Sequence, residues 1–245
     1  MKITKLVLLF NYKKILLGVC VSGFLFAISS QIDSDFFIIL LKALGFLILL
    51  NIIASIIASY ILYDKSDLYD IDKLKEFLNF KKDENVVLIH ASFDPLSKKL
   101  EENFPDLNLT VCDIYGNRHE HDSGITVSKK VFPPNPKEIK INPSQLPFED
   151  KSQDVILAIT AIHEILDHQK RVLFFQEAKR ILKNNGVLIL SEQFRDVTNF
   201  IFFNIGAFHF LSHKQWKKAI SEAGMKIVKK EKITPFANIL TVTNN

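Results

Sequence analysis

The residues most informative about this chain's architecture run from 142 to 186. They include Leu146-Pro147-Phe148-Glu149, then Asp154-Val155-Ile156-Leu157-Ala158-Ile159, and they end with Arg180-Ile181-Leu182-Lys183-Asn184-Asn185-Gly186. The short apolar run predicts a strand that is buried on both faces. Between this strand and the final turn, residues 169–182 place apolar side chains on one helical face. The segment therefore predicts a turn, a buried strand, a helix and a second turn, in that order.

Working outward, short apolar strands alternate with amphipathic helices on both sides of this segment. A helix that ends at Gly224 fits the preference for glycine just after a helix. Strands separated by helices are expected to pair in parallel through right-handed crossovers, which gives an α/β, doubly wound sheet. The predicted strands are 86–90, 109–113, 138–142, 154–160, 187–192, 225–230 and 239–243, and the predicted helices are 95–104, 169–182 and 214–223.

The order of these segments resembles class I S-adenosylmethionine (SAM)-dependent methyltransferases of the type 11-like group. The resemblance covers residues 85–243. It implies a Rossmann-like, mostly parallel seven-stranded sheet closed by an antiparallel hairpin, with SAM as the cofactor and methyl transfer as the activity. One motif departs from the family. The family has an acid and several glycines after the first strand, whereas this chain has no glycine from Glu84 through Tyr115.

The resemblance implies cofactor contacts at the carboxyl ends of the strands. Asp113 ends the second strand, where a carboxylate binds ribose hydroxyls, although it could instead cap the turn that follows. Asn142 matches the acid that meets the adenine amino group, or it is a turn residue before a proline. Asp94 either faces the cationic cofactor or only caps the next helix. The remaining candidates are His90, Ser92 and Ala161.

Candidates for the chemistry follow the fourth and fifth strands. Methyl transfer depends more on alignment than on acid–base groups, so few catalytic residues are expected. His163 and Glu164 are candidates for a base near the transferred methyl, or they form a structural pair at a helix start. Glu192 and Arg195 follow the fifth strand. Further pocket candidates are Gln193, Asn199, His209 and His213, and the aromatic segment 199–210 is either a cover over an apolar substrate or core or membrane-facing packing.

The sequence predicts no metal site. His163 and His168 are five positions apart, so at about 100° per residue they do not share a helix face as the zinc protease motif requires. His119-Glu120-His121-Asp122 would place two imidazoles on one face of a strand, but the surrounding residues favour a polar loop.

Two apolar runs, 15–32 and 43–63, precede the α/β pattern. Each is long enough to cross about 30 Å of hydrocarbon, and neither has a polar face. A signal peptide is the alternative for the first run. Basic residues before the first run predict a cytoplasmic N-terminus. The expected organisation is a multi-pass anchor in the inner (cytoplasmic) membrane (1–63), a connector (64–83) and a cytoplasmic methyltransferase-like domain (84–245).

The composition limits the kinds of partner that the chain is expected to bind. The chain has 245 residues, a net charge of +4 and two cysteines, Cys20 and Cys112, so no disulfide framework is expected. The sequence has no basic stripe, so no nucleic-acid partner is expected. The expected partners are the lipid bilayer and a small or lipidic substrate, and the sequence does not indicate an oligomeric state. The function expected is membrane-anchored, SAM-dependent methyl transfer. The alternative is a non-catalytic methyltransferase-like membrane protein that binds a partner or another ligand.

Overall fold

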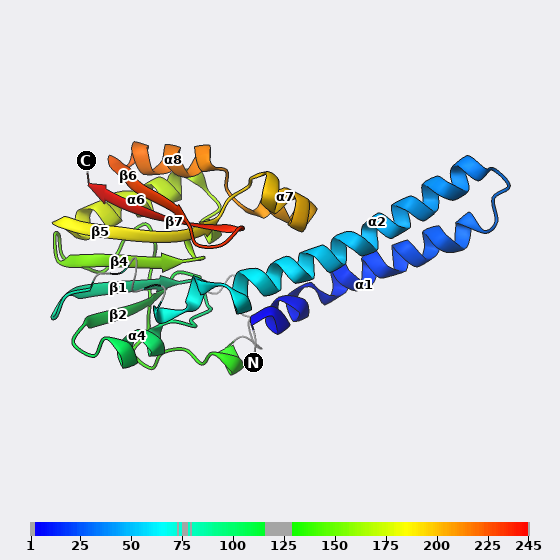
Figure 1. The fold of residues 1–245 in the computed structure, drawn as a ribbon. Coiled ribbons are helices and arrows are strands. Elements are labelled where there is room, and N and C mark those ends of the chain that lie inside the picture. The colour runs from blue at the N-terminus through cyan, green and yellow to red at the C-terminus, as the bar shows by residue number, and fades with distance from the viewer. Residues whose placement is uncertain (1–2, 73, 75–77, 79, 116–128, 245) are drawn as a thin grey trace.

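A computed structural model describes residues 3–72, 74, 78, 80–115 and 129–244. Two long helices project from an α/β domain (Figure 1). They are α1 (Ile3–Ser29) and α2 (Asp35–Tyr60), and α2 continues into a π-helical turn, η1 (Ile61–Lys65). By length and composition alone, both helices are apolar enough to cross a membrane. The predicted run 15–32 extends three residues beyond α1, and the run 43–63 lies within α2 and η1.

The hairpin of α1 and α2 exposes much of its apolar surface. Leu17, Phe24 and Phe36 are 65%, 64% and 68% exposed. The two helices contact each other along a narrow seam, where the Ser22 hydroxyl donates a hydrogen bond to the carbonyl oxygen of Gly45 at 2.8 Å. A core helix of a soluble domain buries such side chains. The exposed apolar surface therefore favours the membrane-span interpretation over a core helix.

The sheet has seven strands in the order β3-β2-β1-β4-β5-β7-β6. Neighbours from β3 to β5 are parallel, and β7 runs antiparallel to both β5 and β6. The predicted doubly wound sheet with a closing antiparallel hairpin is thus confirmed. The bounds are β1 (Asn85–His90), β2 (Asn108–Asp113), β3 (Ile139–Lys140), β4 (Gln153–Ile159), β5 (Leu182–Gln193), β6 (Met225–Lys232) and β7 (Ala237–Asn244).

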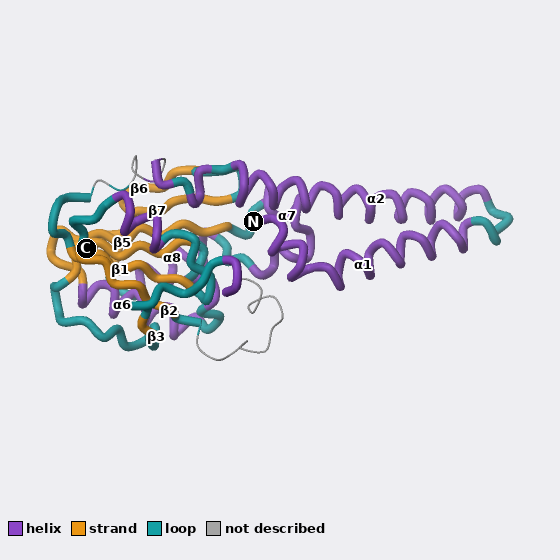
Figure 2. Tube along the Cα trace, turned by 90° about the horizontal axis from the view of Figure 1, so that it is seen from below, coloured by secondary structure: helices purple, strands orange, loops and turns teal. Residues whose placement is uncertain are grey.

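Helices and short helical turns connect these strands. The α-helices of the domain are α4 (Ser97–Asn103), α6 (His168–Ile181), α7 (Val197–Phe203) and α8 (His213–Glu222). The 3-10 turns are η2 (Asp67–Tyr69), η3 (Ile162–Glu164) and η4 (Asn204–His209). Figure 2 shows the helical hairpin extending away from the strand-rich domain.

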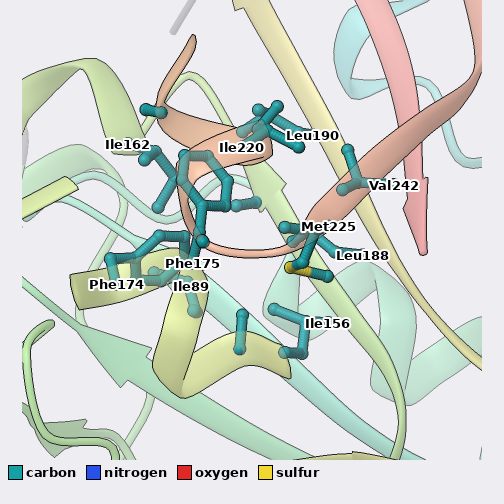
Figure 3. Close-up of a cluster of buried hydrophobic side chains, with 14 of the residues drawn as sticks. Ile89, Ile156, Ile162, Phe174, Phe175, Leu188, Leu190, Ile220, Met225 and Val242 are labelled. Carbon is teal, nitrogen blue, oxygen red and sulfur yellow. The ribbon is translucent and has the colours of Figure 1, made fainter. Parts of the chain in front are cut away.

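Alternate residues of the central strands enter two separate hydrophobic cores. Val87 and Ile89 of β1 face the core under α6 and α8, which contains Phe174, Phe175 and Trp216 (Figure 3). Val86 and Leu88 face the other core, on the side of α4. Side chains alternate between the faces of a strand, so a strand that is covered on both faces is apolar throughout. This explains the continuous apolar runs of the sequence.

The connector between the hairpin and β1 is part of the second core. Leu68, Leu74 and Leu78 are buried in it together with residues of β1 and β4. These leucines lie near helical spacing in the sequence, but their packing partners are distant in the chain. The hydrophobic packing of the domain therefore begins before residue 84.

Three local expectations differ from the structure. The expected third strand shortens to the two exposed residues of β3 at the sheet edge, where only β2 pairs with it. The helix expected from residue 95 begins at Ser97. The turn at 183–186 lies inside β5 as an irregularity, because Leu182 pairs with Gln153 and Val187 with Val155. Gly224 has φ +72°, as expected of a glycine after a helix.

Candidate functional site

The carboxyl ends of β1, β2, β4 and β5 lie at the edge of the sheet that faces the helical hairpin (Figure 1). Two tyrosines from the foot of α2, which consists of the turns η1 and η2 that follow it, contact this edge. The Tyr63 hydroxyl donates to Oε1 of Gln193 at 3.2 Å, and the hydroxyls of Tyr69 and Thr160 are 2.6 Å apart. In open α/β sheets, ligands bind beyond the carboxyl ends of the strands. The hairpin thus joins the domain at the edge where a ligand site is expected.

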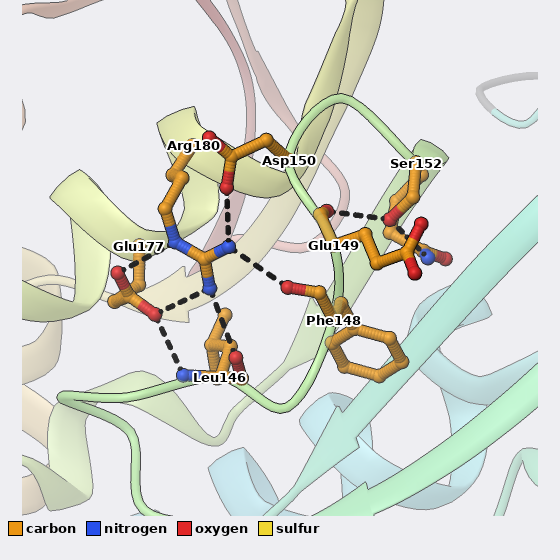
Figure 4. A network of polar contacts seen from close by, with 8 residues as sticks. Leu146, Phe148, Glu149, Asp150, Ser152, Glu177 and Arg180 are labelled. Atoms are coloured by element: carbon orange, nitrogen blue, oxygen red, sulfur yellow. Dashed lines mark hydrogen bonds and ion pairs between the residues drawn. The ribbon is translucent and has the colours of Figure 1, made fainter.

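The Leu-Pro-Phe turn is held by one arginine of α6 (Figure 4). Arg180 donates to the carbonyl oxygens of Leu146 and Phe148 at 2.9 and 2.8 Å, and it pairs with Glu177 and Asp150 at 2.8 and 2.7 Å. Glu177 also accepts the N–H of Leu146 at 2.8 Å. The hydrogen bond from Arg180 is the main cause that lowers the pKa of Glu177. The motif that carries the resemblance is therefore a turn locked to the helix after β4.

The loop after β1 takes its shape without a glycine. Ser92 has φ +60°, a left-handed conformation that glycine adopts most readily. Oδ1 of Asp113, at the end of β2, accepts the N–H groups of Ser92 and Tyr115, both at 2.9 Å. Oδ1 of Asp94 accepts the N–H groups of two residues that lead into α4, at 3.0 and 2.8 Å. Carboxylates thus stabilise the loop, and Asp94 caps the turn before α4.

Buried polar groups surround a small cavity beneath this loop. The cavity is too narrow to hold a water molecule, and its lining includes His90, Ser92, Asp94, Asp113 and Glu138. Nε2 of His90 is 3.2 Å from Oε2 of Glu138, but the orientation does not make a hydrogen bond. Among the described residues, both ring nitrogens of His90, Oδ2 of Asp94 and Oε2 of Glu138 are buried without a hydrogen-bond partner. Burial is the largest cause that raises the pKa of Glu138.

A buried polar atom without a hydrogen-bond partner carries a desolvation penalty of about 1–3 kcal/mol, which a bound ligand, ion or water removes. Acidic groups beside an imidazole suit a cationic ligand that carries hydroxyl groups. Typical small-molecule sites hold roughly 300–1,000 Å³. A ligand of nucleoside size therefore fits here only when the lining residues move apart. Glu138 is a lining residue that sequence reasoning missed, although it begins the expected third strand, 138–142.

The other two cofactor candidates lie apart from this cavity. Asn142 is exposed, and its Oδ1 accepts the N–H of Ser144 at 3.0 Å, so it stabilises a turn. Ala161 is fully buried and donates its N–H to Glu192 at 3.2 Å. Neither residue lines the cavity among the described residues.

A second polar cluster follows β4 and β5. Glu192 is 1% exposed, and its Oε1 accepts N–H groups of Ala161, Ile162 and His163 at 3.2, 2.9 and 3.3 Å. Its Oε2 is 2.7 Å from Nδ1 of His163. Burial lowers the pKa of His163, but the charges of Glu192 and Glu164 outweigh it and raise that pKa to about 10. Glu192 therefore fixes the orientation of the His163 ring.

The structure brings His209 of η4 into this cluster. Oε1 of Glu164 lies 3.5 Å from Nε2 of His163 and 3.6 Å from Nε2 of His209. The two imidazole rings meet edge to face, with centroids 5.2 Å apart. His209 was a pocket candidate in the sequence, but its contact with Glu164 depends on the folding of η4. That long-range contact has no local sequence signal.

The remaining candidates surround this cluster at greater distance. Arg195 donates to Oε1 of Gln215 at 2.8 Å, and its guanidinium lies 5.9 Å from the ring centre of Phe208. Asn199 is buried and donates to two backbone carbonyls, so its role is structural. His213 packs against Phe194. His168 pairs with Glu222 at 2.7 Å. The segment from His119 to Asp122 lies outside the described residues.

The segment of α7 and η4, residues 197–209, forms an apolar cover beside the hairpin. Part of it packs inward, because Phe202 and Phe203 contact Phe236. The outer side is exposed, with Ile205 at 77%. α7 lies next to α2 (Figures 1 and 2), and Nδ2 of Asn51 donates to the carbonyl oxygen of Ile201 at 3.3 Å. The inward part therefore packs in the core, as one of the two alternatives expected, and the role of a substrate cover stays a prediction. Its other exposed apolar residues are Val197, Phe200, Ile201 and Phe208.

Comparisons with known proteins agree with this architecture. Residues 96–190 match the profile of the methyltransferase domain family. A SAM-dependent methyltransferase from Aquifex aeolicus aligns with a TM-score of 0.54 and 16% identity over 72% of this chain and 90% of that one. A protein from Pyrococcus horikoshii aligns with a TM-score of 0.54 and 15% identity over 73% and 89%.

A SAM-dependent methyltransferase from Methanosarcina mazei aligns with a TM-score of 0.52 and 13% identity over 70% of this chain and 96% of that one. No curated protein matches the sequence. At these identities, the solved structures show the fold. The domain therefore has the Rossmann-like fold of class I SAM-dependent methyltransferases, and its residues 96–190 match the methyltransferase domain family.

Proposed function

We propose that this protein is a membrane-anchored, SAM-dependent methyltransferase that acts on a lipidic substrate. The observation that carries the proposal is the position of the anchor. Tyr63 and Tyr69, at the foot of α2, contact the carboxyl edge of the sheet, and the exposed apolar cover lies next to α2. An apolar acceptor that reaches this edge from a bilayer would pass along the cover. SAM supplies an electrophilic methyl group on a sulfonium.

The residues around the cavity under the loop after β1 are assigned to the cofactor. Asp113 ends β2, where a carboxylate can accept the ribose hydroxyls. Asp94 and Glu138 place acidic groups near a ligand that carries an ammonium and a sulfonium, and His90 lines the same cavity. If the lining residues moved apart, SAM would enter and supply hydrogen-bond partners for the buried atoms of His90, Asp94 and Glu138. His90 and Asp113 end neighbouring parallel strands, and this position supports the assignment.

The acceptor is assigned to the cluster of His163, Glu164 and His209. Glu192 of β5 lies two strands from β1 in the sheet, which is about 10 Å at the usual strand spacing. Glu192 acts as a positioning residue, since it is buried and holds the His163 ring and the backbone of η3. Glu164 and His209 lie on the accessible side of the cluster. They are placed to contact the polar end of an acceptor whose apolar part lies under the cover.

For the membrane part, we propose that residues 1–63 are a two-span anchor in the inner (cytoplasmic) membrane and that the domain lies in the cytoplasm. The basic residues before the first span favour this orientation. A reporter fused after the last residue tests it. A fluorescent protein, which fails to fold after export by the general secretion route, should be bright, and an alkaline phosphatase fusion should be inactive. The reverse result would refute the orientation.

Cofactor binding is tested with the full chain in lipid nanodiscs by calorimetric titration of SAM. We expect micromolar binding, which corresponds to about −8 kcal/mol. Asp113→Asn keeps the oxygen that accepts the Ser92 and Tyr115 N–H groups but removes the charge, and it should weaken SAM binding at least tenfold. Asp106→Asn, before the start of β2, is the matched control and should bind as the wild type does. Equal binding by both variants would remove Asp113 from the cofactor site.

A second candidate function is a non-catalytic domain that binds a partner or another ligand. Rings of Tyr69, Phe93 and Phe132 pack edge to face beside the small cavity, with centroids 6.0 and 5.0 Å apart. If these rings keep the loop closed, no nucleoside enters. A folded full chain that shows no heat with millimolar SAM would favour this function over methyl transfer.

A further inference from the structure

The cluster of His163, Glu164 and His209 has the donor atoms and spacing of a metal site. One nitrogen from each histidine and one oxygen of Glu164 all lie within 4.8 Å of one another. Glu164 and His163 are adjacent in η3, and His209 ends η4. No sequence motif predicted this set, because the folding of the apolar cover brings the third residue to the other two. The set contains two imidazoles and one carboxylate, which suits zinc and similar divalent metals.

The measured spacings agree with tetrahedral coordination. Ligands at about 2.1 Å from a tetrahedral zinc ion are about 3.4 Å from one another. Oε1 of Glu164 lies 3.5 Å from Nε2 of His163 and 3.6 Å from Nε2 of His209. Direct hydrogen bonds between such atoms are about 2.7–3.2 Å long. The third spacing, between the two imidazoles, is at most 4.8 Å, so rotamer adjustments would bring the three donor atoms around one ion.

Glu192 supplies the outer support that metal-binding histidines require. A ligating imidazole almost always donates its other ring N–H to a carboxylate or carbonyl, which fixes the tautomer and the ring orientation. Nδ1 of His163 is 2.7 Å from Oε2 of Glu192, so Nε2 is the nitrogen turned toward Glu164. Glu192 is itself held by three backbone N–H groups of η3 and the residue before it. The buried carboxylate of Glu192 thus orients the more exposed imidazole of His163.

We propose that His163, Glu164 and His209 bind one divalent transition-metal ion, with zinc as the best match. Three protein ligands leave a fourth position for an exchangeable group, as in catalytic zinc sites. His209 is 48% exposed, so the ion would be reached from the side of the apolar cover. The fourth position would bind the polar oxygen of the acceptor and favour its deprotonated form. This last assignment rests on the proposed function, whereas metal binding itself does not.

Metal binding is tested with the full chain in detergent after treatment with a chelator. Titration with Co²⁺ reports tetrahedral coordination by its visible absorption, and competition with Zn²⁺ gives the zinc affinity. We expect one ion per chain, with Mg²⁺ unable to displace it because Mg²⁺ prefers oxygen ligands. His209→Ala removes an exposed ligand without touching the core and should weaken binding at least 100-fold. Glu192→Gln should weaken it about 10- to 100-fold, the usual effect of losing the outer partner.

Two controls separate this site from other histidines. His168→Ala removes a histidine that also pairs with a glutamate but lies outside the cluster, and it should leave the affinity unchanged. A variant without His119 and His121 should also bind as the wild type does. Absence of stoichiometric binding, or binding unaffected by His209→Ala, would overturn the proposal. The titration contains no SAM, so its failure leaves the SAM titration to judge the proposed function separately.

Discussion

Arg180 of α6 donates a hydrogen bond to the carbonyl oxygen of Leu146 at 2.9 Å, so the helix after β4 holds the turn before β4. The same guanidinium also binds the carbonyl oxygen of Phe148, which closes the turn from both ends. The turn, the strand and the helix thus form one unit joined by a side chain. This explains physically why the Leu-Pro-Phe turn and the helix occur together in the sequence.

Arg180→Ala should destabilise the domain by about 2–3 kcal/mol, since it leaves two carbonyls and two carboxylates without their charged donor. The chain has one tryptophan, Trp216, which is fully buried, so its fluorescence reports unfolding of the domain. Urea unfolding in detergent, followed at this residue, gives the difference. Lys218→Ala breaks an exposed pair with Glu222 and serves as the control, with an expected change below about 0.5 kcal/mol. Similar midpoints for both variants would contradict the role of Arg180.

The contribution of Glu177 should depend on pH. The hydrogen bond from Arg180 lowers the pKa of Glu177 in the folded state below the value of about 4.3 in the unfolded chain. A carboxyl group with a lowered pKa stabilises the fold above the unfolded value, and this stabilisation is lost as the pH falls through the folded value. The stability difference between wild type and Glu177→Gln should therefore be full at neutral pH and shrink below about pH 4. Glu102→Gln, in an exposed pair, should show little difference at either pH.

Gly186→Ala should destabilise the protein by about 1–3 kcal/mol through overpacking. A Cβ at this position would lie 3.0 Å from the carbonyl oxygens of Gln153 and Asp154, and backbone atoms cannot move aside easily. Gly206→Ala is the matched control, because its Cβ would find its nearest neighbour at 3.8 Å. Thermal unfolding followed at Trp216 should separate the two variants. Equal midpoints would mean that the irregularity in β5 relaxes without strain.

Asp64→Ala should loosen the start of α1. Oδ1 of Asp64 accepts the N–H of Ile3 at 2.7 Å, Oδ2 accepts the N–H of Thr4 at 3.1 Å, and the Thr4 hydroxyl also bonds to it. Loss of a helix cap typically costs about 1 kcal/mol. Amide hydrogen exchange at Ile3 and Thr4 should accelerate, while the unfolding midpoint at Trp216 stays unchanged. Asp33→Ala, in the turn at the opposite end of the hairpin, should leave exchange at these amides as it was.

Much of the fold was predictable because its strands and helices carry strong local patterns. β4 and α6 follow from an apolar run and a 3.6-residue periodicity, and the parallel pairing follows from the alternation of strands and helices. The segment 197–209 gave no such signal. Its apolar residues divide between the core and the exposed side, so no single periodicity indicates α7. The packing of Leu68 and Leu74 in the domain core was equally hidden, because it depends on strands far along the chain.

The site was predictable only where strand ends define it. His90, Asp94 and Asp113 meet around one cavity because parallel strands bring their carboxyl ends to one edge. Asn142 was expected beside them, but it is exposed and stabilises its own turn. The contact of His209 with Glu164 required a segment whose helical structure the sequence did not indicate. Contacts of that kind depend on tertiary packing rather than on spacing.

The tie between the hairpin and the domain has a consequence for kinetics. Tyr63 and Tyr69 hold the carboxyl edge of the sheet against the foot of α2, so the domain is not a tethered body that turns freely. With the hairpin in a bilayer, that edge would meet molecules that diffuse laterally within one leaflet. The rate would then follow the mole fraction of the acceptor in that leaflet. Dilution of the membrane with inert lipid would slow turnover, whereas dilution of the whole suspension with buffer would not.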